Sequence, residues 1–173
     1  MMMAMLEAGG LPVLSDGVRT ADDDNPRGYY EFERVKQLPQ RDVGWLPDAR
    51  GRAVKVISGL LEHLPDGERY RIVFMRRHLG EVLSSQREML ARRGEATDAT
   101  SDAKMAEFFS NHLARVESWL AARPNMDVLY VSYNELLDDP RRHAERVAVF
   151  LNCGLDVAAM TQAVSASLYR QRR

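Results

Sequence analysis

A guanidinium and a hydroxyl stand at a spacing that suits phosphate binding. Arg77 lies two residues beyond the apolar run 70–75, and Ser85 follows Arg77 by eight residues. If the run is a strand and the next segment a helix, Arg77 lies at the carboxyl end of the strand and Ser85 on the second helical turn. Both side chains can then contact one phosphate, because arginine and a helix N-terminus favour anions. The alternative is a surface arginine and a helix serine that never meet.

A lysine inside a second apolar run is the next candidate. Lys55 stands in the middle of the β-branched segment 53–57, which is typical of a strand. A charge is expensive to bury without a partner. Lys55 therefore either faces a functional site or extends from the sheet edge to solvent.

Thiol and metal chemistry find little support in the sequence. The single cysteine, Cys153, excludes an internal disulfide and a thiolate metal cluster, and its place after an apolar segment predicts a buried structural thiol. The four histidines show no metal-ligand spacing, so no metal is predicted.

The elements that must position these residues alternate along the chain. Strands are predicted at 11–14, 53–57, 70–75 and 127–132, and helices at 1–8, 31–38, 59–64, 80–93, 104–122, 140–150 and 156–164, with a loop at 95–102. Strands separated by helices require crossover connections, which predict a mostly parallel sheet covered on both faces, a three-layer α/β/α fold. Ligands bind at the carboxyl ends of such strands.

Composition narrows the possible partners. The 24 basic and 25 acidic residues nearly cancel, so no global field attracts nucleic acid or an anionic membrane. The apolar segment 1–14 has no positive region and breaks at Gly9 and Gly10, so it is neither a signal peptide nor a membrane span. One domain over residues 1–173 and a cytoplasmic location are therefore predicted.

Segment 70–86 is similar to the 3′-phosphate motif of the P-loop sulfotransferases. That motif is an apolar strand, an arginine, usually Asn/Asp-Pro, an acidic residue, and a serine eight residues after the arginine; here His78 and Leu79 replace the Asn/Asp-Pro pair. Segment 24–31 resembles the acceptor-side loop of bacterial members, 128–140 their late strand, and 167–172 their closing basic segment. The resemblance covers nearly the whole chain, in the family's order.

The resemblance implies an enzyme that uses 3′-phosphoadenosine-5′-phosphosulfate (PAPS) and has the P-loop NTPase-like sulfotransferase fold. Arg77 and Ser85 would bind the 3′-phosphate of the nucleotide. Arg170 and Arg172 would also reach the nucleotide, unless they form only a basic tail. Lys55 matches a family lysine near the transferred group, where it would stabilise sulfonate charge.

The catalytic base stays open. Many members carry a histidine two residues after that lysine, but Ile57 stands there and accepts no proton. Glu31 is the preferred substitute, because some members use a carboxylate; the alternative is a first-turn acid stabilised by its helix. Asp16 and the acidic run 22–24 are further candidates.

The acceptor is implied to be a hydroxyl or amine on a small molecule, a carbohydrate or a lipid. Four aromatic residues either line an apolar acceptor pocket or pack in the core: Tyr29, Tyr30, Phe32 and Trp45. The oligomeric state is left open.

The start of the chain departs from the family pattern. The family begins with a strand and a glycine-rich loop that holds the 5′-phosphosulfate, followed by a helix that residues 1–8 resemble. We therefore expect a domain that is incomplete at its N-terminus and a sheet without its first strand. Two alternatives remain: a kinase-like P-loop nucleotide-binding relative, and a non-catalytic remnant of the fold.

Overall fold

The computed structural model describes residues 1–18, 28–92 and 99–164, without the side chains of some helical residues, Ser85 among them. The α-helices are α1 (Met2–Ala8), α2 (Leu46–Ala49), α3 (Leu79–Arg92), α4 (Ala99–Ala121), α5 (Tyr133–Asp138), α6 (Pro140–Leu151) and α7 (Val157–Gln162). The 3₁₀ helices are η1 (Glu33–Gln40) and η2 (Ser58–His63), and the strands are β1 (Tyr70–Arg76) and β2 (Met126–Ser132).

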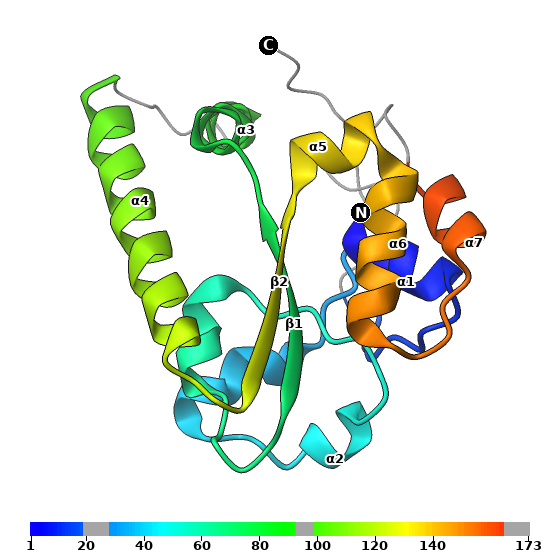
Figure 1. Ribbon diagram of the computed structural model, residues 1–173. Helices are drawn as coiled ribbons and strands as arrows, with labels where there is room; N and C mark the ends of the chain where they lie inside the picture. Colours follow the sequence, from blue (N-terminus) through cyan, green and yellow to red (C-terminus); the bar gives the residue numbers. More distant parts are fainter. Residues whose placement is uncertain (19–27, 93–98, 165–173) are drawn as a thin grey trace.

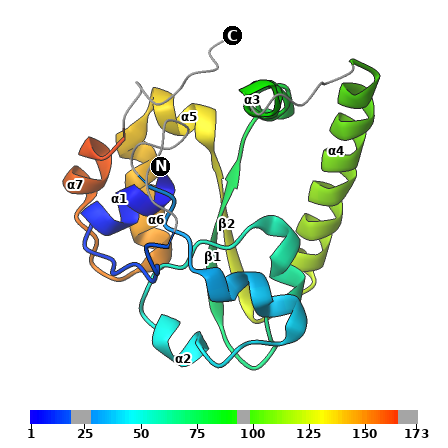
Figure 2. The ribbon, with the colours of Figure 1, turned by 180° about the vertical axis from the view of Figure 1, so that it is seen from behind.

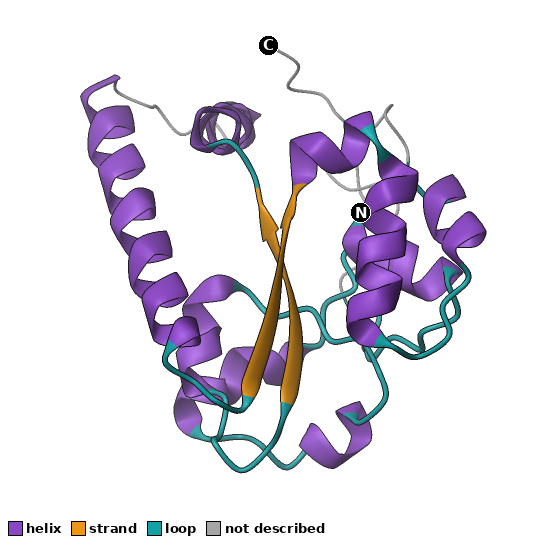
Figure 3. Ribbon diagram, viewed as in Figure 1, coloured by secondary structure: helices purple, strands orange, loops and turns teal. Residues whose placement is uncertain are grey.

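The two strands form the middle layer of the described part. They pair in parallel, from Tyr70 opposite Met126 to Arg76 opposite Ser132. Helix α4 lies on one side of them, and α6, α1 and α7 lie on the other (Figures 1 and 2). Figure 3 shows the strands between these helical layers. The predicted α/β class with parallel strand pairing is therefore confirmed.

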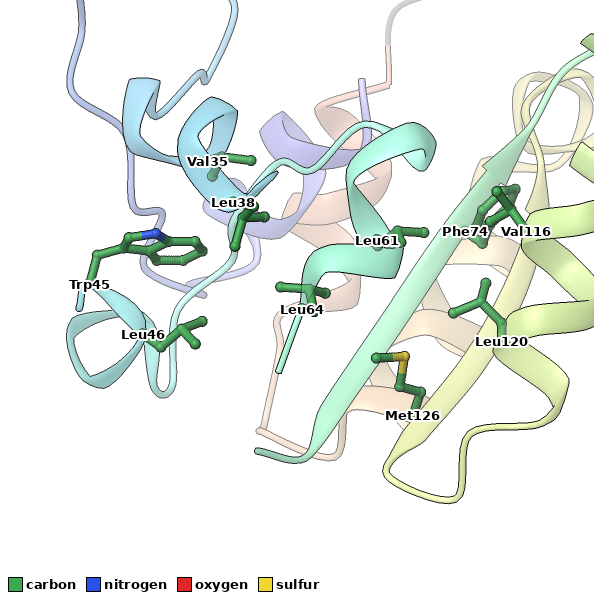
Figure 4. Packing of buried hydrophobic residues seen from close by; sticks show 10 residues of the cluster. All are labelled: Val35, Leu38, Trp45, Leu46, Leu61, Leu64, Phe74, Val116, Leu120 and Met126. Atoms are coloured by element: carbon green, nitrogen blue, oxygen red, sulfur yellow. The ribbon is translucent and has the colours of Figure 1, made fainter. Parts of the chain in front are cut away.

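Each face of the strand pair carries its own apolar core. On the α4 side, Phe74 of β1 and Met126 of β2 pack with helix and loop residues in one cluster (Figure 4). On the other side, Val131 of β2 packs with residues of α1, α5, α6 and α7. A strand pair that is apolar on both faces is typical of a sheet covered by helices. The helices therefore fix the position of both strand ends.

Local signals set the starts of two late helices. Pro140 occupies the first position of α6, and the Asp139 carboxylate accepts a hydrogen bond from the Arg142 backbone N–H at 3.1 Å. The Asp156 carboxylate accepts from the Ala159 N–H at 2.9 Å at the start of α7. These caps place the starts of α6 and α7 where the sequence predicts them, at 140 and next to 156.

Two predicted strands are wrong. Segments 11–14 and 53–57 share one parallel bridge, between Val13 and Ala53, and neither is a strand. Its hydrogen bonds run from the Leu14 N–H to the Ala53 carbonyl (2.9 Å) and from the Ala53 N–H to the Pro12 carbonyl (2.8 Å). A strand needs a continuous ladder of such bonds. Within the described residues no further pair extends this bridge into a ladder. The β-branched composition of 53–57 was therefore not sufficient to predict a strand.

Three smaller predictions also fail. Helix α4 begins at Ala99, inside the predicted loop 95–102, and Cys153 is exposed. Helix α5 was missed, although Ser132 and Glu135 have the spacing of a capping box, and the Glu135 N–H does donate to the Ser132 hydroxyl at 3.3 Å.

Among the described helices, none has both the length and the apolar character that a bilayer crossing requires.

Two valines on α6 allow a matched test of the core. Val147 is fully buried between α6 and the strands, whereas Val149, two residues later, is 80% exposed. We expect Val147→Ala to lower the free energy of unfolding by about 2 kcal/mol through lost apolar burial and a residual cavity. Val149→Ala should change it by less than about 0.5 kcal/mol. Urea denaturation of both variants measures the difference; equal losses would contradict the packing described.

Candidate active site

The carboxyl ends of β1 and β2 lie at one level. Arg76 pairs with Ser132 in the last step of the ladder, so Arg77 and Tyr133 leave the sheet side by side. The Arg77 guanidinium lies 5.1 Å from the centre of the Tyr133 ring. Parallel pairing in this register therefore brings together residues that are 56 positions apart, at the end of the sheet where ligands bind in such folds.

A buried carboxylate fixes the orientation of the arginine. Glu81 lies in the first turn of α3 with its side chain only 7% exposed. It accepts a hydrogen bond from Arg77 Nε at 3.0 Å and another from Asn134 Nδ2 at 2.7 Å. A carboxylate this deeply buried needs such partners. Arg77, Glu81 and Asn134 thus form a small polar network joining β1, α3 and α5.

The neighbouring arginine makes different contacts. Arg76 donates to both carboxylate oxygens of Glu117 on α4, at 2.9 and 2.6 Å, and its guanidinium lies 4.0 Å from the centre of the Tyr130 ring.

Burial raises the pKa of the Tyr133 phenol, and the nearby Arg77 charge partly offsets this rise. Tyr133 therefore keeps its proton at neutral pH.

The two predicted catalytic residues meet. Lys55 Nζ lies 3.7 Å from Glu31 Oε1 and donates to the Tyr29 carbonyl at 3.0 Å. Glu31 is 19% exposed, and its second oxygen lies 3.4 Å from Lys36 Nζ. A carboxylate and an ammonium from segments 24 residues apart thus form one ion pair. This geometry gives Lys55 the partner that its position requires.

A strained turn holds this pair. Tyr30 has φ of +52°, a left-handed conformation that is uncommon for an aromatic residue, and Gly28 has φ of +79°. The Tyr30 hydroxyl donates to Glu7 of α1 at 2.6 Å. Backbone strain of this kind persists only where the surroundings impose it, and it often accompanies functional sites.

Asp16 has another task. Its carboxylate accepts hydrogen bonds from the backbone N–H groups of Glu33 (2.5 Å) and Val18 (3.1 Å). The bond from the Glu33 N–H lowers the pKa of Asp16, which disfavours it as a proton acceptor. The other acidic candidates, 22–24, lie outside the described residues.

The aromatic candidates separate into two groups. Trp45 is buried in the core and packs edge-on against Phe32, with ring centres 5.5 Å apart. Tyr29 and Tyr30 line a cleft of about 1330 Å³, together with Lys55; Trp45 also borders this cleft but is only 2% exposed. Tyr29 and Tyr30 therefore remain candidates for contact with an acceptor, whereas Trp45 and Phe32 belong to the core.

One pair of polar residues had no signal in the sequence. His112 Nε2 of α4 lies 2.9 Å from the Ser58 hydroxyl, three residues beyond Lys55. The two residues are 54 positions apart, so no local spacing announces them. Within the described residues, no group of three or more His, Cys, Asp or Glu side chains is arranged to hold a metal ion.

The predicted nucleotide-binding residues are only partly placed. Arg77 lies at the carboxyl end of β1, as expected, and Ser85 belongs to α3, four residues after Glu81. The side chain of Ser85 is outside the described part, and so are Arg170 and Arg172. The joint grip of Arg77 and Ser85 on a phosphate therefore stays a prediction.

A model of the sulfotransferase family matches residues 22–157. The chain belongs to the sulfotransferase family. The comparisons with curated proteins and with solved structures gave no match. Membership in this family indicates sulfuryl transfer in general, from a nucleotide sulfate donor to small-molecule acceptors. It also favours this chemistry over the kinase-like alternative.

Two ion pairs at the end of β1, Arg77–Glu81 and Arg76–Glu117, differ in burial and should differ in their contribution to the free energy of unfolding. We expect Glu81→Ala to lower the free energy of unfolding by about 2–3 kcal/mol, because it leaves Arg77 and Asn134 without their buried acceptor. Glu117→Ala removes the more exposed partner of Arg76 and should cost less than about 1 kcal/mol. Chemical denaturation of both variants at one ionic strength tests this order, and a larger loss for Glu117→Ala would contradict it.

Proposed function

We propose that this sulfotransferase family member transfers the sulfuryl group of PAPS to a hydroxyl or amine acceptor at the Glu31–Lys55 pair. The observation that carries the proposal is the distance of 3.7 Å between Lys55 Nζ and Glu31 Oε1. The sequence had indicated Lys55 by its charge inside an apolar run and by its match to a family lysine, and Glu31 by resemblance alone, each for a different part of one reaction. Their contact supports placing the proton acceptor and the cation at the same reacting centre.

Arg77 and the start of α3 suit the 3′-phosphate of the donor. The guanidinium is held through Nε by Glu81, which directs the planar group across the carboxyl end of β1. In this proposal its terminal nitrogens contact the phosphate, and the first N–H groups of α3 face the same anion. Glu81 and Asn134 are then positioning residues, which act through Arg77 and do not touch the nucleotide.

Glu31 and Lys55 divide the transfer step between them. The acceptor oxygen or nitrogen forms a bond to sulfur as the bond from sulfur to the bridging phosphate oxygen breaks. Glu31 takes the acceptor proton, and adenosine 3′,5′-bisphosphate leaves with the electron pair. Lys55 stabilises the negative charge of the sulfonate oxygens in the transition state. Tyr29, whose carbonyl holds Lys55, and Tyr30 stand on the acceptor side.

The donor site is tested with adjacent arginines. We expect Arg77→Ala to weaken binding of adenosine 3′,5′-bisphosphate by about 2–3 kcal/mol, the loss of a charge-assisted contact. Arg76→Ala is the matched control, because Arg76 pairs with Glu117 and has no role in the proposed site. Isothermal titration calorimetry on both folded variants measures the affinities. Unchanged binding by Arg77→Ala, or equal losses in both variants, would contradict the assignment.

The base is tested with two glutamates that share a lysine. We expect Glu31→Gln to lower kcat by about 10²–10⁴-fold, because glutamine cannot accept the acceptor proton. Its affinity for adenosine 3′,5′-bisphosphate should stay within about twofold of wild type. Glu33→Gln is the control: Glu33 also contacts Lys36, at 2.6 Å, but shows no ion pair with Lys55. Steady-state sulfuryl transfer from PAPS to a panel of phenols, alcohols and amines measures kcat, and wild-type turnover by Glu31→Gln would remove Glu31 as the base.

A further inference from the structure

Within the described residues, strand β1 has a hydrogen-bonded neighbour on one edge only. The described sheet consists of β1 and β2, and the Tyr70 N–H donates toward β2, to the Asn125 carbonyl at 2.9 Å. Successive residues of a strand in a parallel ladder present their main-chain groups to opposite edges. Arg71, Val73 and Met75 therefore direct their N–H and C=O groups away from β2, where no described main-chain group bonds to them.

This edge of β1 opens onto the cleft. The six residues 70–75 all line it, and so does the extended segment 53–57. Its volume of about 1330 Å³ exceeds the range of about 300–1000 Å³ that is usual for small-molecule pockets. A row of main-chain donors and acceptors along one wall is complementary to another peptide backbone, because such an edge is a template for strand addition.

The middle of the cleft is apolar. Ile72, Val73 and Phe74 line it on the β1 side, and Val56 and Ile57 line it on the other. Ile57 is 63% exposed, which is unusual for a large aliphatic side chain that lines an apolar cleft. An occupant that covers these residues must itself be apolar.

One end of the cleft is basic. Arg69 directly precedes β1 and Arg71 is its second residue, and both line the cleft, as does Arg52. In total the lining holds five basic side chains and two acidic ones: Arg50, Arg52, Lys55, Arg69 and Arg71 against Glu68 and Asp127. Arg50 is already paired with Glu68 at 2.7 Å, whereas Arg52 and Arg69 form no ion pair with any described residue. The charge favours an acidic group at this end.

We propose that the cleft binds an extended peptide segment as an additional strand of the sheet. The segment pairs its backbone with Arg71, Val73 and Met75, places apolar side chains against Ile57 and Phe74, and carries an acidic residue at the end next to Arg69. Main-chain pairing provides the affinity, and the apolar and acidic side chains provide the selectivity. The peptide shares the cleft with Tyr29, Tyr30 and Lys55, but its pairing with β1 does not require sulfuryl transfer at Glu31 and Lys55.

The probe is a synthetic hexapeptide with the sequence of residues 127–132, Asp-Val-Leu-Tyr-Val-Ser, acetylated and amidated at its ends. That sequence already forms a parallel ladder with β1 and begins with an acid. Added to the 173-residue protein, it should slow hydrogen exchange of the Arg71, Val73 and Met75 amides by at least about tenfold. Exchange of the Ile72 and Phe74 amides, which face β2, should not change.

Two modified peptides identify the mode of binding. The same hexapeptide with N-methyl groups on alternate amides keeps every side chain but loses its donors along one edge. Two such peptides are made, one for each set of alternate amides. The peptide methylated on the edge that pairs with β1 should bind at least about tenfold more weakly than the unmodified peptide. If the other edge also pairs across the cleft, both methylated peptides should do so. Replacement of the peptide's aspartate by lysine should weaken binding further in low salt, because of Arg52 and Arg69.

A variant of the protein tests the same edge. Val73→Pro removes one outward N–H and leaves the ladder with β2 unbroken, since proline is tolerated on the free side of an edge strand. It should abolish peptide protection while keeping the circular dichroism spectrum; should it fail to fold, the N-methylated peptides decide. Equal binding of N-methylated and unmodified peptides, loss of protection in β2 itself, or dimerisation of the protein through this cleft would each overturn the proposal.

Discussion

The parallel register of β1 and β2 is the constraint on which the site depends. It ends both strands at one level and so delivers Arg77, Tyr133 and Asn134 to a common place, where Glu81 joins them from α3. The two apolar cores hold this register, because a shift of one residue would move Phe74 and Val131 out of their clusters. The chemistry at the strand ends is thus a consequence of packing far from it.

The sequence predicted best where local signals and burial agree. The apolar run that became β1 and the Asp139–Pro140 helix start both formed as expected, because each depends on nearby residues. Phe108 shows the limit: it shares the periodic apolar spacing of α4 with Val116, yet it is 65% exposed while Val116 is buried. Periodicity gives the apolar face of a helix, but only tertiary packing decides how far along the helix that face is covered.

The second part of the site follows a different logic. Residues 53–57 have strand-like composition but pair with Val13 at a single position, so Lys55 is held by a loop and not by a ladder. Tyr30, which follows the residue whose carbonyl accepts from Lys55, adopts a left-handed backbone conformation that is uncommon for an aromatic residue. The apolar run and the family resemblance together indicated Lys55, and the resemblance indicated Glu31. The Ser58–His112 contact could not be predicted from the sequence, because 54 residues separate the two.

A buried carboxylate beside Arg77 is compatible with the anion-binding role proposed for this arginine. Glu81 carries the charge opposite to that of Arg77 and therefore reduces the net attraction for a phosphate. In return, its contact to Nε and the Asn134 bond to its second oxygen fix the guanidinium plane, so the arginine loses less side-chain entropy when a ligand arrives. An unsupported arginine at a strand end would attract an anion more strongly but hold it less specifically. The network therefore fixes the orientation of Arg77 at some cost in net positive charge, which is the arrangement that the proposed in-line transfer from a positioned donor requires.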